Sequence, residues 1–205
     1  MLKQLLAALT LLTVLSPASA TLTFTLTQEG PDVIGRVNGS VNTAAIPPVG
    51  GSTTCNGPTG VGAFLPSTAT VCVAGSNLIG HPGLVGPTSF GAGGAVLATS
   101  GAGDAAFIQG STGTVYLPPG YVSGSVLSGS SVFPGTTLAA MGAPIGTYTY
   151  TFGAGPTADT VVVIIGGEAR HVAVPALNEY GMLALVALLM LSAALSPRKS
   201  RSGRP

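Results

Sequence analysis

The sequence predicts an all-β protein: a glycine-rich antiparallel β-sandwich, exported as an ectodomain, between an N-terminal signal peptide and one C-terminal transmembrane helix. Three observations lead to this prediction. Apolar and polar residues alternate with a period of two in several short runs, turns rich in glycine and proline separate these runs, and an apolar segment lies near each end of the chain. Glycine, with 31 of 205 residues, is about twice as frequent as usual.

Residues 1–20 have the features of a secretory signal peptide. Lys3 supplies a positive charge, residues 5–15 form a short apolar run, and the small residues Ala18 and Ala20 form an Ala-x-Ala cleavage pattern. We expect signal peptidase to cut after Ala20 and to leave residues 21–173 as the exported domain. An uncleaved N-terminal anchor is the alternative, although no second charged boundary follows the apolar run.

Alternation with threonine or glycine predicts the strands of the exported domain. The residues expected on buried faces are Leu22, Phe24 and Leu26, then Val33, Val37 and Val41, then Val115 and Leu117, and finally Tyr148, Tyr150 and Phe152. Residues 161–165 are apolar on both faces, which is typical of a central strand. Residues 136–141 are the one stretch that could form a helical turn.

The region 46–103 shows no clear period and contains the only two cysteines of the chain, Cys55 and Cys72. In an exported protein this spacing predicts one intrachain disulfide, and closing such a loop stabilises a fold by about 3 kcal/mol. A disulfide between two chains is the alternative. A zinc site would need more ligands than two thiols and the distant His81, so we expect no metal and no cofactor.

The charge of the exported domain excludes nucleic acid as a partner. Residues 21–173 contain five acidic and two basic side chains, so that nothing there could neutralise a row of phosphates. Neither histidine stands in a recognisable arrangement with a nucleophile and an orienting acid, so we expect no enzyme activity. His81, Asp104 and Asp159 follow or precede turn sequences and are expected to be turn residues.

The last part of the chain predicts a membrane anchor. The stretch from Glu179 to Ser196 would span about 27 Å as a helix, near the lower limit for crossing a bilayer, and residues 182–196 are its apolar part. The tail, residues 197–205, begins with Pro197 and contains the basic residues Arg198, Lys199, Arg201 and Arg204, which favour the cytoplasmic side. A buried helix of a soluble domain is the alternative, but this segment lacks a polar face.

A short motif precedes this helix. It consists of Val174, Pro175, Ala176, Leu177, Asn178, Glu179, Tyr180 and Gly181. The motif resembles the Ile-Pro-Thr-Leu type of C-terminal sorting signal (IPTL-CTERM), a relative of the Pro-Glu-Pro (PEP-CTERM) sorting domains that exosortases process in Gram-negative bacteria. Pro175, Leu177, Glu179, Gly181 and Met182 match that pattern, whereas Val174, Ala176, Asn178 and Tyr180 depart from it conservatively. The resemblance implies that these residues are the substrate of a membrane-embedded sorting protease.

The exported domain also resembles small cargo proteins that have Pro-Glu-Pro sorting signals. The similar stretches are 21–28, 115–124, 127–130, 146–153 and 158–159. Those relatives usually have tryptophan where this chain has Tyr150 and Phe152. This resemblance implies a cargo family without a settled activity and transfers no catalytic residue.

The sequence leaves two main classes of function open. The first is a structural or interaction protein of the cell envelope or extracellular matrix, anchored in the cytoplasmic membrane and sorted to the surface. The second is a secreted enzyme or carbohydrate-binding module, with an envelope polysaccharide as the ligand. The scarcity of His, Asp, Glu, Arg and Trp favours the first class. A membrane-anchored protein that no sorting protease cleaves is a third alternative.

Overall fold

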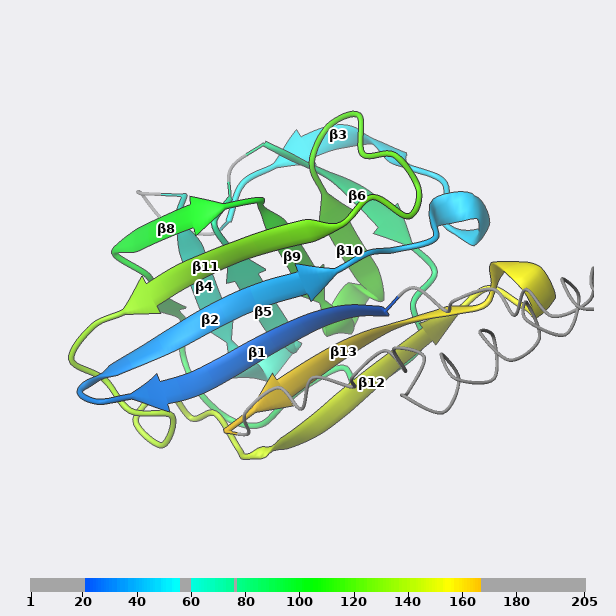
Figure 1. Cartoon of the computed structure of the whole chain (residues 1–205). Helices are drawn as coiled ribbons and strands as arrows, with labels where there is room; N and C mark the ends of the chain where they lie inside the picture. Colours follow the sequence, from blue (N-terminus) through cyan, green and yellow to red (C-terminus); the bar gives the residue numbers. More distant parts are fainter. Residues whose placement is uncertain (1–20, 56–59, 76, 167–205) are drawn as a thin grey trace, which may run out of the picture. The chain divides into compact units, whose positions relative to one another are not determined.

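The computed structural model describes residues 21–55, 60–75 and 77–166, and these form two β-sheets packed face to face (Figure 1). The six-stranded sheet has the order β12 (Gly146–Phe152), β13 (Asp159–Ile165), β1 (Thr21–Glu29), β2 (Asp32–Gly39), β11 (Leu127–Phe133), β8 (Ser100–Gly103). The seven-stranded sheet has the order β3 (Val49–Thr53), β6 (Leu78–Pro82), β10 (Thr114–Leu117), β9 (Ala106–Gln109), β5 (Thr70–Val73), β4 (Gly62–Leu65), β7 (Val96–Leu97). The prediction of an all-β fold is confirmed.

The pairing of β1 with β13 corrects the prediction of a purely antiparallel sandwich. These two strands run parallel, from Thr21 beside Thr160 to Leu26 beside Ile165, whereas the other paired strands of both sheets are antiparallel. Parallel neighbours cannot be joined by a hairpin, and here the first and last described strands meet in the middle of the six-stranded sheet. The described domain is therefore closed by contact between its two ends.

The core lies between the sheets and consists of the residues that alternate inwards. The predicted residues Leu22, Phe24 and Leu26 are fully buried, as are Val33, Val37 and Val41, Val115 and Leu117, and Tyr150. Phe152 is also buried, and Tyr148 is partly buried. The facing sheet adds Phe64, Val71, Val73 and Ile108. The alternation in the sequence therefore predicted the inner faces correctly.

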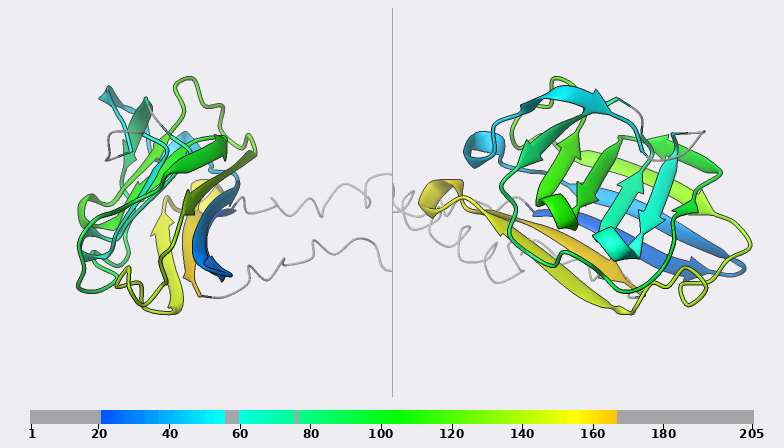
Figure 2. Two further views of the ribbon diagram at one scale, coloured as in Figure 1. Left: turned by 90° about the vertical axis from the view of Figure 1, so that its left-hand side faces the viewer. Right: turned by 180° about the vertical axis from the view of Figure 1, so that it is seen from behind.

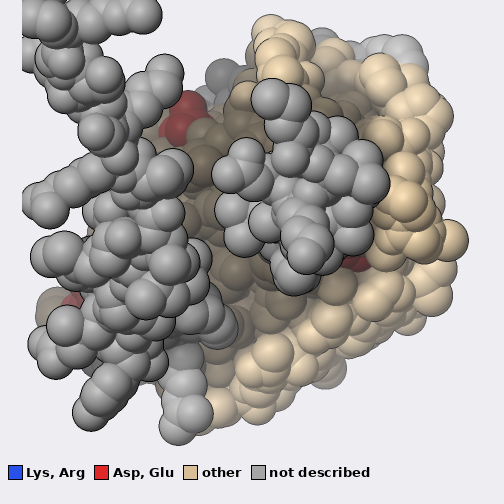
Figure 3. Space-filling model, turned by 45° about the vertical axis from the view of Figure 1, so that its right-hand side comes forward, with Lys and Arg blue, Asp and Glu red and all other residues tan. Residues whose placement is uncertain are grey.

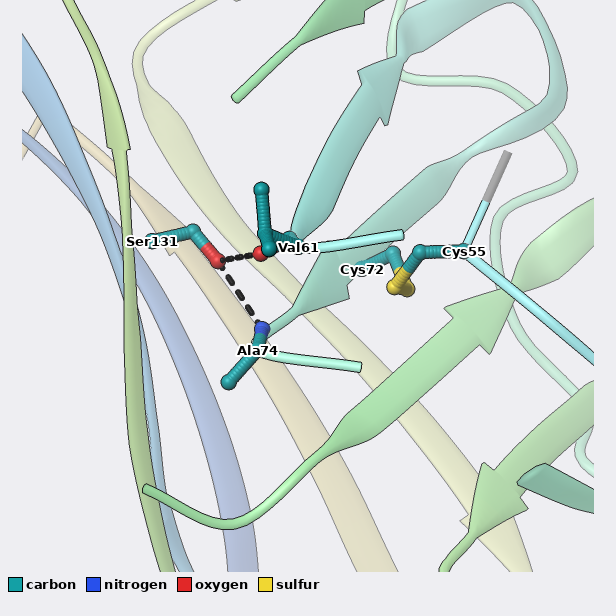
Figure 4. The surroundings of a disulfide bond; sticks show 5 residues. All are labelled: Cys55, Val61, Cys72, Ala74 and Ser131. Carbon is teal, nitrogen blue, oxygen red and sulfur yellow. Dashed lines mark hydrogen bonds between the residues drawn. A yellow bond between two sulfur atoms is a disulfide. The ribbon is translucent and has the colours of Figure 1, made fainter. Parts of the chain in front are cut away.

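The hydroxyl group of Ser131 connects the two sheets through this core (Figure 4). Ser131 lies on β11, is fully buried, and donates a hydrogen bond to the carbonyl oxygen of Val61 at 2.6 Å. It accepts a second hydrogen bond from the backbone N–H of Ala74 at 2.9 Å. Val61 precedes β4 and Ala74 follows β5, so one side chain of the six-stranded sheet holds the open end of a hairpin in the other.

A close approach of the backbone makes this connection possible. A Cβ atom at Gly62 would lie 2.5 Å from the Ser131 hydroxyl oxygen and 2.9 Å from the Ala98 methyl group. Only glycine allows the chain to pass at this distance.

The seven-stranded sheet contains an internal repeat (Figure 2). Residues 62–73 form the hairpin of β4, the 3₁₀ helix η2 (Pro66–Thr68) and β5, and residues 106–117 form the hairpin of β9, η3 (Gly110–Thr112) and β10. The two turns read Ser-Thr-Ala-Thr-Val and Ser-Thr-Gly-Thr-Val. Each 3₁₀ helix ends at a left-handed residue, Ala69 (φ 49°) or Gly113 (φ 59°). In each, the two threonine hydroxyls are hydrogen-bonded, at 2.8 Å in the first hairpin and 3.2 Å in the second.

Two residues that were expected in turns are buried in the structure, so that expectation was wrong. Asp159 begins strand β13 and is 3% exposed, and its carboxylate accepts hydrogen bonds from the backbone N–H groups of Asn42 and Thr160. Burial raises the pKa of this carboxyl group. His81 lies in β6, and its Nδ1 donates to the carbonyl oxygen of Ile46 at 2.7 Å. Asp104 is exposed as expected and accepts from the N–H of Ser128.

The stretch 136–141 contains the helical turn that the sequence suggested, although no α-helix is assigned there. The N–H of Met141 donates to the carbonyl oxygen of Thr137. Bonds from Ala143 to Leu138 and from Gly142 to Ala139 then close the turn in the pattern that ends many helices, with Gly142 at φ +65°.

Ala69 and Gly113 occupy equivalent positions in the two hairpins, but substitutions at these positions should affect stability differently. Gly113→Ala should destabilise the fold by about 2 kcal/mol or more, because the residue is left-handed and its Cβ would overlap the carbonyl oxygen of Leu84. Ala69→Gly should change stability by less than about 1 kcal/mol, since relief of the left-handed backbone offsets the loss of a buried methyl group. Urea unfolding of both variants measures the difference. Equal effects would contradict the role assigned to the backbone of Gly113.

The buried carboxyl group of Asp159 should make stability fall as the pH rises. Its pKa is raised in the folded state, so the folded protein binds the proton more tightly than the unfolded chain does. Stability from this group is complete below the unfolded pKa, about 3.9, and is lost as the pH passes through the folded pKa. The side chain of Asp159→Asn does not titrate, so the stability of this variant relative to wild type should increase over that pH interval. Any stability difference between the two proteins that does not depend on pH leaves this comparison unchanged. Urea midpoints at several pH values test this, and parallel curves would refute it.

Candidate functional site

The outer face of the seven-stranded sheet has a small second core, which surrounds a disulfide (Figure 4). Cys55, which follows β3, is bonded to Cys72 on β5, with 5.7 Å between the Cα atoms. Both cysteines are buried, and Ala63, Leu78 and Phe107 complete the cluster. The intrachain disulfide predicted from the sequence is thus confirmed, and it fixes the chain after β3 across the outer face of the sheet.

A groove of about 330 Å³ lies on this outer face, which points toward the viewer in the right-hand view of Figure 2. Strands β3, β4, β5, β9 and β10, together with η2, provide its walls and floor. The lining residues are Thr53, Thr54, Ala63, Leu65, Thr68, Thr70, Ala95, Phe107, Gln109 and Tyr116. Ten residues from separate segments therefore form one hollow, and none of them is a charged residue.

Two aromatic rings form the apolar part of the groove. Phe107 and Tyr116 stand opposite each other on the paired strands β9 and β10, and their rings stack with 4.4 Å between centroids and 10° between planes. The neighbouring residue on β6 is Gly80, where a Cβ would lie 3.1 Å from the Tyr116 ring. The absence of a side chain at Gly80 leaves room for this ring to lie over the sheet.

Hydroxyl and amide groups form the polar part. The hydroxyls of Thr68 and Thr70 are 2.8 Å apart and share one hydrogen bond. The Tyr116 hydroxyl donates to Oε1 of Gln109 over a long 3.5 Å. Among the residues of the described ranges, none accepts a hydrogen bond from the amide nitrogen of Gln109, so this donor can bind a ligand. Such groups can donate hydrogen bonds to neutral polar molecules and accept hydrogen bonds from them.

A second hollow, of about 370 Å³, has no comparable chemistry. Its lining consists of Gly91, Ala92, Ala139, Gly142, Ala143 and Pro144. No polar side chain is present in that set.

The other residues singled out in the sequence lie outside the described residues. These are Ala18 and Ala20, the motif 174–181, the predicted helix 182–196, and the basic residues Arg198, Lys199, Arg201 and Arg204. None of the helices within the described ranges is long and apolar enough to span a membrane. In the same ranges, no three His, Cys, Asp or Glu residues are grouped so that they could hold a metal ion.

Comparison with known proteins identifies no family for this chain. Family models, curated proteins and solved structures were each searched, and none of the three searches found a match.

Removal of the disulfide should measure how strongly it supports this face. The double variant Cys55→Ala/Cys72→Ala should lose about 3 kcal/mol of stability relative to oxidised wild type, because the unfolded chain is no longer closed into a loop. Urea unfolding of the oxidised protein, the protein reduced with dithiothreitol, and the double variant makes the comparison. If all three unfold at the same midpoint, the disulfide does not stabilise the fold.

Proposed function

We propose that this chain is an exported, membrane-anchored cell-envelope or extracellular protein with a structural or interaction role rather than a catalytic one. We further propose that an exosortase-type protease sorts it through residues 174–181. The buried Cys55–Cys72 disulfide is the observation that carries the export part of the proposal. Disulfides form and persist mainly outside the reducing cytoplasm, and this one joins two separate segments of the fold.

The position of β1 supports removal of the signal peptide at Ala20. Strand β1 begins at Thr21 and lies between β13 and β2 in the middle of the six-stranded sheet. A cut further along the chain would remove residues that pair on both sides. The predicted cut between Ala20 and Thr21 leaves the central strand whole.

The end of the sandwich supports a short tether to the sorting motif. The N–H of Gly166, the last described residue, donates to the carbonyl oxygen of Leu26 at 2.9 Å. Residues 167–173 then lead to the motif, and seven residues reach at most about 25 Å when fully extended. Few residues thus separate the sandwich from the proposed cleavage motif.

The chemistry of the motif suits recognition in an extended form. Pro175 fixes its own φ and disfavours helix at Val174, so the segment stays open to a protease groove. Glu179 is near the predicted helix N-terminus, where negative charge is favoured, and Gly181 permits close approach of another backbone. Cleavage here would release the ectodomain or transfer it to a surface acceptor, and would leave the helix and the basic tail in the membrane.

A second candidate function is a carbohydrate-binding module, and the uncharged groove favours it. Its hydroxyl, amide and aromatic groups are of the kinds that bind sugars. This candidate concerns what the released or anchored domain binds, so it is compatible with sorting.

Alanine at the two most informative motif positions tests the sorting proposal. In cells with the cognate exosortase, Pro175→Ala/Glu179→Ala should leave export and membrane insertion intact but abolish conversion to a smaller form without the basic tail. Asn178→Ala, at a position that departs from the family pattern, is the matched control and should mature normally. An epitope after Pro205 and immunoblotting follow the conversion. A wild-type chain that keeps its tail indefinitely would disprove sorting.

A further inference from the structure

We propose that the groove on the outer face of the seven-stranded sheet binds a segment of a neutral polysaccharide, with Gln109, Thr70 and Tyr116 as the main contacts. The proposal deepens the interaction role suggested above and rests on it.

Charge selects a neutral ligand. None of the residues that line the groove is acidic or basic. The described part of the chain contains four acidic residues and one basic residue, and that basic residue, Arg36, is paired with Glu29 at 2.6 Å. On the part of another face that Figure 3 shows, a few acidic side chains lie among uncharged residues. An anionic polymer would find no cation here to compensate for its lost hydration, whereas a neutral chain needs none.

Hydrogen-bonding capacity selects a ligand rich in hydroxyl groups. A threonine or tyrosine hydroxyl both donates and accepts, and a glutamine amide offers two donors and two acceptor sites. Sugar hydroxyls have the same double capacity and can satisfy these groups in either direction. The amide nitrogen of Gln109 and the shared Thr68–Thr70 hydroxyl pair are therefore matched by a saccharide without leaving an unpaired buried group.

The shape and apolar lining fit a sugar ring. The volume of about 330 Å³ is at the lower end of the range of small-molecule sites, about 300–1,000 Å³. The stacked rings of Phe107 and Tyr116, together with Leu65 and Ala63, give an apolar surface for the C–H face of a pyranose. The disulfide holds Thr53 and Thr54 near this surface, because Cys55 follows them directly in the chain.

The internal repeat supplies a matched control for Thr70 and a compatible substitution for Gln109. Thr114 is the counterpart of Thr70 in the second hairpin: both are 6% exposed and both are hydrogen-bonded to the preceding threonine of the turn. Only Thr70 lines the groove. In the same way Leu65 is the counterpart of Gln109, so Gln109→Leu installs a side chain that the fold already uses at that place.

The experiment uses the full-length chain in lipid nanodiscs free of glycolipid. Cellohexaose, laminarihexaose and mannohexaose are the neutral probes, and a galacturonate hexamer is the anionic comparison. Saturation-transfer NMR and calorimetry measure binding. We expect at least one neutral hexamer to bind with a dissociation constant in the millimolar range or tighter, and the galacturonate to bind more weakly. Gln109→Leu and Thr70→Val should each weaken binding about tenfold, the loss expected for one hydrogen bond to a ligand.

The control variant decides between ligand contact and general damage to the fold. Thr114→Val should match Thr70→Val in melting temperature and yet bind as wild type does. Absence of binding by all three neutral hexamers would overturn the proposal, as would equal weakening by Thr70→Val and Thr114→Val, or tighter binding of the galacturonate. These results are independent of the cleavage assay that tests the sorting motif, because the chain can be cleaved at its motif whether or not the groove binds a sugar.

Discussion

The buried hydroxyl of Ser131 is a specific polar contact that fixes one hairpin of the seven-stranded sheet against the six-stranded sheet. It joins β11 to the open end of the β4–β5 hairpin by two hydrogen bonds, to Val61 and Ala74, which are also bonded to each other at 3.1 Å. Loss of the hydroxyl would remove both bonds between the sheets, each worth about 1 kcal/mol. The contact also requires Gly62, since any larger residue would meet the serine side chain. The hairpin that it holds also provides Ala63, Leu65 and Thr70 of the outer groove and the cysteine of β5, so this inner contact is linked through the hairpin to the opposite face of the sheet.

The strand pattern could be predicted wherever one face of a strand is buried and the other is not. The threonine-alternating run from Thr21 to Thr27 and the valines of β2 show this, because burial there largely follows every second residue. The region 46–103 could not be interpreted, since its strands are only two to five residues long and include several glycines. The parallel pairing of β1 with β13 could not be predicted either, because local periodicity identifies a strand but not its partner 139 residues away.

The candidate site, too, could be predicted only in part from the sequence. Cysteine spacing was enough to predict the disulfide, because two cysteines in a chain that is expected to be exported leave few alternatives. The groove was not predicted. Phe107 and Tyr116 meet only because β9 and β10 pair, and Gln109 and Thr70 meet across β9 and β5. One signal was available in the sequence, the near-identity of residues 67–71 and 111–115, which marks two equivalent hairpins. Asp159 was misjudged because the turn before it ends at Ala158, and Asp159 is already the first residue of β13.

The parallel pairing of the first and last strands has a consequence for the order of folding. A chain that emerges from the ribosome or from a translocation pore presents β1 first, and the central partner β13 only 139 residues later. The six-stranded sheet cannot close before almost the whole domain has emerged, whereas the β4–β5 hairpin and its disulfide can form from a segment of fewer than twenty residues. Such long-range pairing slows folding. The seven-stranded sheet can therefore serve as the template on which the rest of the sandwich assembles, and the domain stays open for as long as its final strand has not emerged.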